Sequence, residues 1–183
     1  PAKDISWPGK PFIVQWSHGH TGDGTLLVQN EKDLEAIKQK FPERSARASD
    51  FIKGPMFTAN IVVTNSVILL GNISYQVTGA LPFTDNPFTT IGNDWSVTHT
   101  ILSDAHVKDF EVMAQKIGIK MQKDGWKGLF GIDVIYDEER DMLCLIEINA
   151  RQPASTTLES EFQSTLLSHG VKGMTTFEAH LQA

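Results

Sequence analysis

Two apolar segments, each interrupted by an acidic residue, constrain this chain more than any other feature. They are Gly128–Tyr136 and Met142–Asn149, and both are rich in the β-branched and large apolar residues that favour strands. The polar segment Asp137–Asp141 separates them, so the pattern predicts a β-hairpin. Asp133 interrupts the first strand and Glu147 the second. A carboxylate in an otherwise apolar strand needs a chemical reason.

The hairpin is expected to gather its polar side chains on one face. Glu147 and Asn149 share a face because alternate residues of a strand point the same way. A turn of three or five residues within Asp137–Asp141 places Asp133 on that face, opposite Glu147 or one diagonal away. Two carboxylates and an amide oxygen are ligands that Mg²⁺ prefers. Arg151 adds a cation that could bind a phosphate or a carboxylate.

Two other interpretations of the hairpin stay open at this point. It could be an exposed edge whose acidic side chains are simply solvated, although the apolar residues on either side of Glu147 argue against that. It could also be an acid pair of the glycosidase type, which Asn149 and a glycine-rich segment elsewhere in the chain fit poorly.

The remaining pattern predicts a mixed α+β fold with mostly antiparallel sheets. A long loop is expected over Thr78–Trp95, which holds two prolines, two glycines and many small polar residues. The other strands are expected at Phe12–Trp16, Thr25–Gln29, Ser49–Ile52, Phe57–Thr64 and Val67–Val77, and helices after the N-caps Asn30 and Ser103, from near Ser155, and over Thr175–Leu181.

A glycine-rich connection joins the first two expected strands. Its Gly19, Gly22 and Gly24 would let backbone N–H groups approach an anion, and His20 and Thr21 lie among them. A strand follows these glycines, whereas dinucleotide-binding and Walker loops need a helix there. The two interpretations that remain are a flap over a triphosphate and a plain surface hairpin.

Composition excludes several classes of protein. The formal net charge of −6 argues against a nucleic-acid partner held by a basic surface. The apolar runs are far too short to span a membrane. Cys144 is the one cysteine among 183 residues, so the chain has no internal disulfide, and no secretory signal opens it. These features favour a cytoplasmic protein.

On these residues the chain resembles the ATP-grasp superfamily of carboxylate–amine ligases, over roughly residues 11–159. The resemblance is most specific in Gly131-Ile132-Asp133 and in Glu147-Ile148-Asn149-Ala150-Arg151. It implies that Asp133, Glu147 and Asn149 hold one or two Mg²⁺ or Mn²⁺ ions on the phosphates of ATP. It also implies that Arg151 is catalytic, either stabilising an acyl phosphate or holding the acceptor carboxylate.

The resemblance extends to the nucleotide itself. Pro11–Gln15 and the glycine loop are similar to the lid lobe of that family. Ser49, Asp50, Phe51 and Ile52 are similar to the connector whose backbone recognises adenine. Gln15 and the loop residues Gly19, His20, Thr21, Gly22 and Gly24 are therefore expected to bind ATP.

The sequence departs from the family pattern at two positions. Gln15 stands where the family usually has a lysine beside the nucleotide phosphates, so one cation is lost. Met56 stands where some members carry a glutamate for the ribose hydroxyls.

The function implied is a ligase that uses Mg-ATP to activate a carboxylate as an acyl phosphate, which an amine or similar nucleophile then attacks. A non-catalytic ATP-binding or regulatory module is the alternative, motivated by Gln15 and Met56. A carbohydrate- or metal-binding β-rich protein is the third hypothesis.

The resemblance also predicts the domain organisation. Residues 1–52 are expected to form a small lid lobe, and residues 53–183 a larger catalytic lobe. Ligases of this family usually carry a further N-terminal α/β domain, which is expected to be missing here. The chain is therefore expected to be the ATP end of a larger enzyme, and inactive by itself if its substrate site is incomplete.

Overall fold

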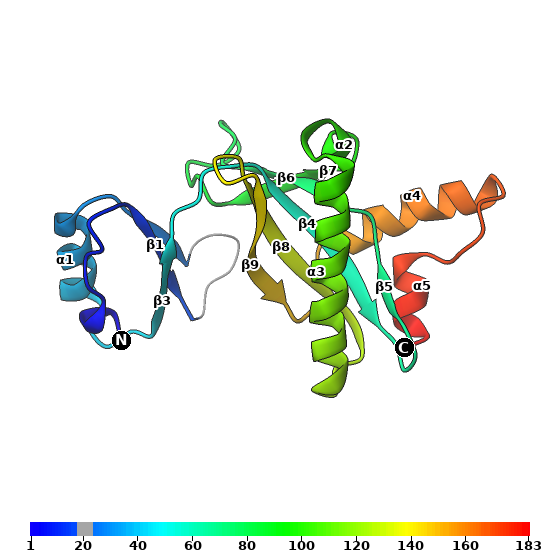
Figure 1. Ribbon diagram of the computed structural model, residues 1–183, viewed down its shortest axis with the longest axis horizontal. Helices are drawn as coiled ribbons and strands as arrows, with labels where there is room; N and C mark the ends of the chain where they lie inside the picture. Colours follow the sequence, from blue (N-terminus) through cyan, green and yellow to red (C-terminus); the bar gives the residue numbers. More distant parts are fainter. Residues whose placement is uncertain (18–23) are drawn as a thin grey trace. The chain divides into compact units, whose positions relative to one another are not determined.

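The computed structural model of the protein describes residues 1–17 and 24–183 (Figure 1). They form two compact units, one made of Pro1–Lys53 and Val77–Gly92, the other of Gly54–Gln76 and Asn93–Ala183. Each unit is built around one antiparallel sheet with flanking helices. The α+β fold class predicted from the sequence is confirmed.

The first unit begins with a short 3-10 helix and then forms a three-stranded sheet in the order β2-β1-β3. Its elements are η1 (Ala2–Asp4), β1 (Phe12–Trp16), β2 (Thr25–Val28), α1 (Glu31–Lys40) and β3 (Ala46–Asp50). Alternate residues of β1 are buried and form a core with Leu34 of α1. Asn30 caps α1, as predicted, by accepting a hydrogen bond from the backbone N–H of Asp33 at 3.1 Å.

The second unit contains a larger sheet of six strands, in the order β7-β6-β4-β8-β9, with β5 paired to β4. Its strands are β4 (Met56–Val63), β5 (Ile68–Leu70), β6 (Ser74–Thr78), β7 (Thr90–Asp94), β8 (Gly128–Asp137) and β9 (Met142–Asn149). Its helices are α2 (Thr98–Ile101), α3 (Asp104–Lys123), α4 (Thr156–Ser168) and α5 (Thr176–Leu181). Although β6 and β7 belong to this sheet, the segment Val77–Gly92, which runs from the end of β6 to the start of β7, groups with the first unit.

The central strand β4 shows how the larger sheet separates an apolar face from a polar one. Phe57, Ala59 and Ile61 point to the face that α3 covers and are at most 2% exposed. Thr58 and Asn60 lie between them and therefore point to the opposite face. The core on the α3 side stabilises the sheet, while the opposite face carries polar side chains that could bind a ligand or an ion.

Three strand expectations need correction. The expected strand Val67–Val77 is interrupted at residues 71–73, where Gly71 donates its backbone N–H to Asn60, so β5 and β6 are separate. The expected strand Ser49–Ile52 begins earlier and ends at Asp50, because β3 pairs along the whole of β1. The expected loop Thr78–Trp95 contains β7. In each case a partner strand far away in the sequence decides the boundary.

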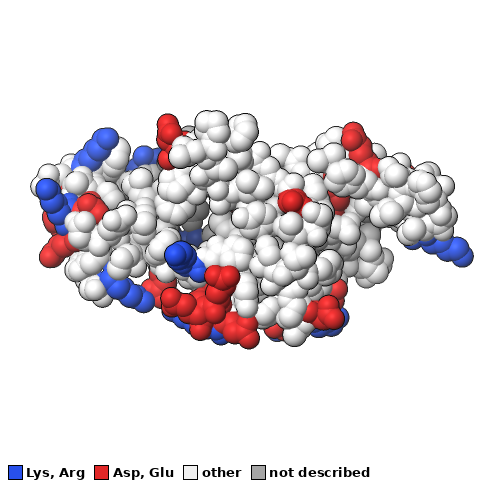
Figure 2. Space-filling model, turned by 90° about the horizontal axis from the view of Figure 1, so that it is seen from above, with Lys and Arg blue, Asp and Glu red and all other residues white. Residues whose placement is uncertain are grey.

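Helix α4 has an unusual distribution of side chains. It buries a carboxylate, Glu159, which is 1% exposed, while Leu158, Phe162 and Leu166 remain 45%, 49% and 53% exposed. The side of the molecule that holds α4 shows few charged side chains in Figure 2. Among the described residues no helix has the length and apolarity required to cross a bilayer.

Candidate functional site

The register of the β8–β9 hairpin brings Asp133 directly opposite Glu147. Near the turn Asp137 pairs with Met142, which leaves four residues in the turn rather than the three or five expected. That register by itself would set Asp133 opposite Ile146 and turn Glu147 to the other face. A β-bulge next to Asp133 adds one unpaired residue to β9, so that Asp133 meets Glu147.

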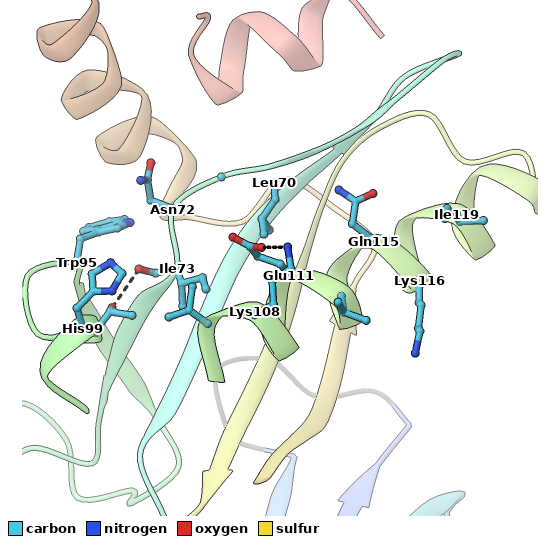
Figure 3. Close-up of a pocket in the computed structure, with 14 residues that line it drawn as sticks. Leu70, Asn72, Ile73, Trp95, His99, Lys108, Glu111, Gln115, Lys116 and Ile119 are labelled. Atoms are coloured by element: carbon cyan, nitrogen blue, oxygen red, sulfur yellow. Dashed lines mark hydrogen bonds and ion pairs between the residues drawn. The ribbon is translucent and has the colours of Figure 1, made fainter. Parts of the chain in front are cut away.

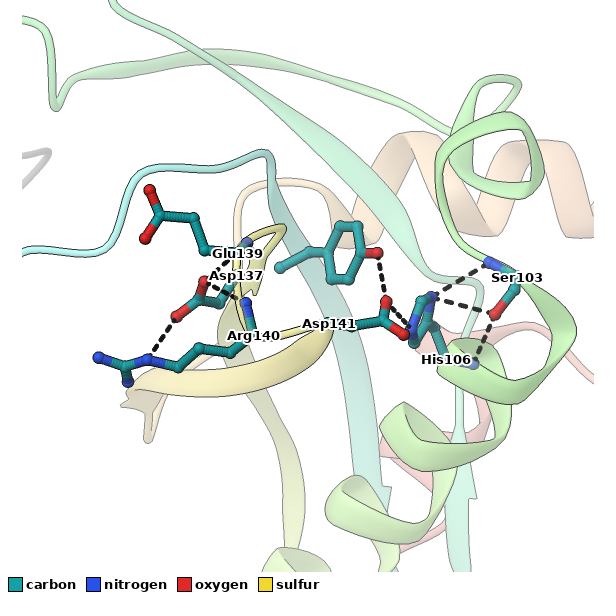
Figure 4. Close-up of polar contacts among 7 residues, drawn as sticks. Ser103, His106, Asp137, Glu139, Arg140 and Asp141 are labelled. Atoms are coloured by element: carbon teal, nitrogen blue, oxygen red, sulfur yellow. Dashed lines mark hydrogen bonds and ion pairs between the residues drawn. The ribbon is translucent and has the colours of Figure 1, made fainter.

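The four-residue turn is held by side-chain contacts within the hairpin and by one contact to α3 (Figure 4). Asp137 accepts backbone N–H groups of Glu139 and Arg140, both at 3.1 Å. Asp141 has a φ of 52° and accepts a hydrogen bond from Tyr136 at 2.7 Å. It also pairs with His106 of α3 at 3.1 Å. The pairing of Asp141 with His106 ties the turn to the start of α3, so tertiary structure contributes to the four-residue turn.

Asp133 lies at the centre of the polar face, between Thr58 of β4 and Glu147 of β9. Gln76 of β6 donates to its Oδ1 and Asn149 to its Oδ2, both at 2.8 Å. Burial raises the pKa of the Asp133 carboxyl above its ordinary value, and the neighbouring polar groups oppose that rise only in part. A half-buried carboxylate with a raised pKa is typical of a functional site.

The segment after β9 carries the cation of the site. Asn149 pairs with Gly131 in the sheet, and its Oδ1 accepts a hydrogen bond from Arg151 at 3.2 Å. The guanidinium also approaches the carbonyl oxygen of Gln152 at 3.4 Å. Arg151 itself is exposed. The structure therefore brings together the four residues expected from the sequence: Asp133, Glu147, Asn149 and Arg151.

The oxygen atoms of this cluster fit a hard divalent cation. Asp133 and Glu147 are direct cross-strand partners, and such partners have Cβ atoms about 5 Å apart. Asn149 lies beside them, with its Nδ2 toward Asp133 and its Oδ1 toward Arg151, and a turn of the amide would offer the oxygen to an ion. No group of three His, Cys, Asp or Glu side chains poised for a metal occurs within the described residues. Two carboxylates with one amide leave coordination positions for phosphate oxygens and water, as Mg²⁺ prefers.

The first unit holds the residues expected to contact the nucleotide. Gln15 on β1 lies opposite Arg47 on β3, and the Arg47 guanidinium donates to Gln15 Oε1 at 2.8 Å. The side chain that replaces the usual lysine thus has a cation as its neighbour. Gly24 ends the glycine connection and accepts a backbone hydrogen bond from Trp16 at 2.9 Å. The other loop residues, Gly19, His20, Thr21 and Gly22, lie outside the described residues.

The expected adenine connector follows the end of β3. Ser49 and Asp50 are the last two residues of the strand, and Asp50 forms an ion pair with Lys10 at 3.0 Å. Phe51 is 39% exposed and Ile52 is half-buried, and neither is in a strand. These residues stay predictions as nucleotide contacts.

A hollow of about 670 Å³ lies on the side of the sheet that carries α3 (Figure 3). It is lined by the residues after β5, by Trp95 and His99, and by the exposed face of α3. None of the expected site residues lines it. The candidate chemistry therefore belongs to the polar face of the sheet and not to this hollow.

Sequence reasoning missed several polar residues of the same region. Gln76 reaches Asp133 from β6, and Asn60 lies on β4 opposite Gly131, two residues along the strand from Thr58. Asn60 could have been noticed as the one amide in the apolar segment Phe57–Val63. Glu159 and Arg47 carry no signal in the sequence, because only tertiary pairing brings them to Asn60 and to Gln15.

The fold and this site define a class of protein. Residues 1–155 match the sequence family of the ATP-grasp domain, so the chain belongs to the ATP-grasp family. The resemblance inferred from Asp133, Glu147, Asn149 and Arg151 is thereby confirmed at the level of the family. No protein of curated function matches the sequence.

Solved structures with the same fold include several ligases. N5-carboxyaminoimidazole synthetase from Staphylococcus aureus, complexed with ADP, is 20% identical with a TM-score of 0.61, and the match covers 96% of this chain and 40% of that one. L-amino acid ligase from Bacillus licheniformis is 18% identical, with a TM-score of 0.63 and coverages of 98% and 40%. Biotin carboxylase from Campylobacter jejuni is 15% identical, with a TM-score of 0.64 and coverages of 96% and 40%. The chain thus spans about 40% of the length of these relatives.

Proposed function

We propose that this chain is the nucleotide-binding part of an ATP-dependent ligase that joins a carboxylate to an amine. The observation that carries the proposal is the direct pairing of Asp133 with Glu147, with Asn149 and Arg151 beside them, on the polar face of an ATP-grasp sheet. The solved relatives named above include a synthetase complexed with ADP and an amino acid ligase, which supports this class of reaction.

The proposed reaction has two steps. A carboxylate oxygen of the substrate attacks the γ-phosphorus of ATP, and ADP leaves, which forms an acyl phosphate. The amine then attacks the acyl carbon, inorganic phosphate leaves, and a proton is lost from the nitrogen. Positioning and charge stabilisation supply most of the catalysis in such phosphoryl transfers, so the site needs no nucleophilic serine or cysteine.

Each residue of the site has a role in this proposal. Asp133, Glu147 and Asn149 would hold Mg²⁺ through oxygen atoms, and the ion, when bound, neutralises charge on the phosphates. Arg151 would bind the transferred phosphoryl group, because its guanidinium can form two parallel hydrogen bonds to phosphate oxygens.

Arg47 extends the proposal to the lid. The guanidinium of Arg47 contacts Gln15 at 2.8 Å, on the strand that precedes the glycine loop. The guanidinium of Arg47 on β3 can supply the positive charge that a lysine at the position of Gln15 would have provided. We therefore assign Arg47 to the phosphates of ATP, with Gln15 orienting its guanidinium.

Two measurements on the intact gene product test the proposal. Mg-ATP is expected to raise the melting temperature, because a ligand that binds only the folded state stabilises it. Release of ADP is then expected to depend on adding one of a panel of amino acids. Asp133→Asn and Glu147→Gln should abolish both effects. Glu139→Gln removes the same charge from the exposed β8–β9 turn and serves as the matched control.

The outcomes separate the hypotheses. An unchanged melting temperature with Mg-ATP would exclude nucleotide binding and favour a carbohydrate- or metal-binding protein. A raised melting temperature without ADP release for any carboxylate would favour the non-catalytic ATP-binding module. Loss of activity in Glu139→Gln to the same degree as in Glu147→Gln would remove the support for a specific site.

A further inference from the structure

Glu159 on α4 is a fully buried carboxylate with no cationic partner among the described residues. It is 1% exposed, and its Oε2 accepts a hydrogen bond from Asn60 Nδ2 at 2.6 Å. Its Oε1 accepts the backbone N–H of Asn72, and the Thr176 hydroxyl contributes a further hydrogen bond. Burying a carboxylate costs free energy unless hydrogen-bond donors surround it. Both oxygens of Glu159 have such donors.

Asn60 links Glu159 to the start of α4. Its Nδ2 also lies 3.2 Å from Ser155 Oγ, and its Oδ1 lies 3.4 Å from the Thr156 hydroxyl. That hydroxyl also donates to the carbonyl oxygen of Pro153 at 2.8 Å. Glu159 thus reaches, through one amide side chain, Ser155 and Thr156 where the connection from β9 enters α4.

This connection begins at Asn149, in the cluster that it forms with Asp133 and Glu147. Asn60 pairs with Gly131, and Gly131 pairs with Asn149, so Asn60 lies two rows of the sheet away from Asp133 and on the same face. The Pro153 ring lies directly over Gly131, where an added Cβ would be 2.7 Å from its Cγ. The connection that carries Arg151 is therefore held at one end by Asn149 and Asp133, and at the other by Asn60 and Glu159.

We propose that Glu159 is a positioning residue: by fixing the orientation of the Asn60 amide, it holds the 149–156 connection and sets where Arg151 presents its guanidinium to a phosphoryl group. The inference rests on the proposed function of Arg151. Glu159 lies on α4, outside the segment Glu147–Arg151, and acts on the reaction without touching substrate.

The chemistry of the carboxylate explains why a glutamate is needed at this position. An ionised carboxylate only accepts hydrogen bonds, so both Asn60 and Asn72 must direct N–H groups toward it. The Asn60 oxygen is then left for the Thr156 hydroxyl. An amide in place of this carboxylate keeps one acceptor oxygen and sets its NH2 group against a donor, either the Asn60 amide or the backbone N–H of Asn72. The backbone N–H cannot turn, so the clash is relieved by a flip of the Asn60 amide away from its present contacts.

Close packing keeps the carboxylate in place. A Cβ added at Gly71 would collide with Glu159 Oε1, so the backbone after β5 approaches the carboxylate as only glycine allows. Asn72 follows at the rim of the hollow drawn in Figure 3, and Gln163 of α4 donates to its Oδ1 at 3.2 Å. Glu159 therefore cannot move without moving the chain between β5 and β6.

A swap of the two side chains tests the inference. Glu159→Gln is expected to weaken binding of Mg-ATP by the intact gene product about tenfold, because small displacements of a positioned group have large effects. Asn60→Asp alone should do the same, since it sets two carboxylates together.

The double variant, Glu159→Gln with Asn60→Asp, exchanges the amide and the carboxylate and so restores the pairing. The amide now on α4 donates to the carboxylate now on β4 and accepts the backbone N–H of Asn72. That carboxylate in turn accepts a hydrogen bond from the Ser155 hydroxyl, while the Thr156 hydroxyl keeps its bond to the carbonyl oxygen of Pro153. The affinity of the double variant should return to within about threefold of the parent.

Amide hydrogen exchange over residues 149–156 gives a second readout. Exchange there should be faster in both single variants and return to the parental rate in the double variant. Gln122→Ala is the matched control, because it removes a hydrogen bond of 2.8 Å to Thr64 at the far end of α3 and should leave both readouts unchanged. If Glu159→Gln fails to fold, Ser155→Ala removes only one Asn60 contact and should weaken binding about threefold.

Three results would overturn the inference. One is a folded Glu159→Gln variant with a lower melting temperature but parental affinity for Mg-ATP, because the residue would then serve stability alone. Another is a folded double variant that binds no better than the single ones. The third involves Arg151→Ala: parental affinity in that variant would overturn the proposed function as well. Weak binding by Arg151→Ala with parental binding by Glu159→Gln would overturn only the role of Glu159.

Discussion

Replacing Gly131 with alanine should impair the site more than it impairs the fold. Gly131 lies on β8 between Asn60 and Asn149, and the Pro153 ring packs directly over its Cα. An alanine Cβ would lie 2.7 Å from Pro153 Cγ, whereas ordinary contacts begin near 3.4 Å. The difference, 3.4 − 2.7, requires Pro153 to move by at least 0.7 Å.

The size of the effect follows from what Pro153 carries. Overpacking by one methyl group costs about 1–3 kcal/mol of unfolding free energy, which a domain of this size tolerates. A displacement approaching 1 Å in a connection that positions a reacting group can cost on the order of 100-fold in rate. Gly131→Ala is therefore expected to lose about 10- to 100-fold in ADP release while remaining folded.

The assay compares two glycines. ADP release and urea unfolding are measured for Gly131→Ala and for Gly92→Ala, whose added Cβ would meet no atom within 4 Å. The β7 variant should match the parent in both measurements. Equal activity in the two variants, with Gly131→Ala folded, would refute the claim that the 149–156 connection sets the position of Arg151.

Three further predictions rest on other parts of the chain. Arg47→Ala should weaken Mg-ATP binding about tenfold while Arg47→Lys keeps most of the affinity, because the charge is retained; calorimetric titration checks both, and equal affinities would contradict the assignment. Burial raises the pKa of the Asp133 and Glu159 carboxyls above their ordinary values of 3.8 and 4.5, so the stability they contribute is full below about pH 4 and is lost as pH rises through the raised values. Urea unfolding between pH 4 and pH 8 should therefore show a smaller fall in Asp133→Asn and Glu159→Gln than in the parent, and an equal fall would contradict the raised values. Thr175→Ala should cost about 1 kcal/mol, because the Thr175 hydroxyl caps α5; a parental urea midpoint would show that the cap contributes nothing.

Much of the site could be predicted from local sequence because it lies on one hairpin. Residues two apart on a strand share a face, so Glu147 and Asn149 had to point the same way. The turn joins the two strands within a few residues, which leaves few registers to choose from. The N-caps Asn30 and Ser103 were equally readable, because a cap needs only the residues of its own helix.

The register itself could not be predicted in this way. The four-residue turn is closed locally by the Tyr136–Asp141 hydrogen bond and is tied to α3 by the pairing of Asp141 with His106, and only the second contact depends on how α3 packs on the sheet. The bulge beside Asp133 then corrects the face of Glu147. Two departures from regular hairpin geometry compensate each other, and the bulge beside Asp133 has no local sequence signal.

The sequence by itself determined the local pattern on which the proposed chemistry rests: alternation in two short strands, a cation two residues beyond them, and a glycine-rich connection near the start of the chain. Only the tertiary structure decided which residues support that chemistry. Gln76 reaches Asp133 across 57 residues of sequence, Arg47 reaches Gln15 across 32, and Glu159 reaches Asn60 across 99. Local patterns arise from backbone geometry within a strand or helix, whereas these pairs exist only once the strands have paired and α4 has packed on the sheet.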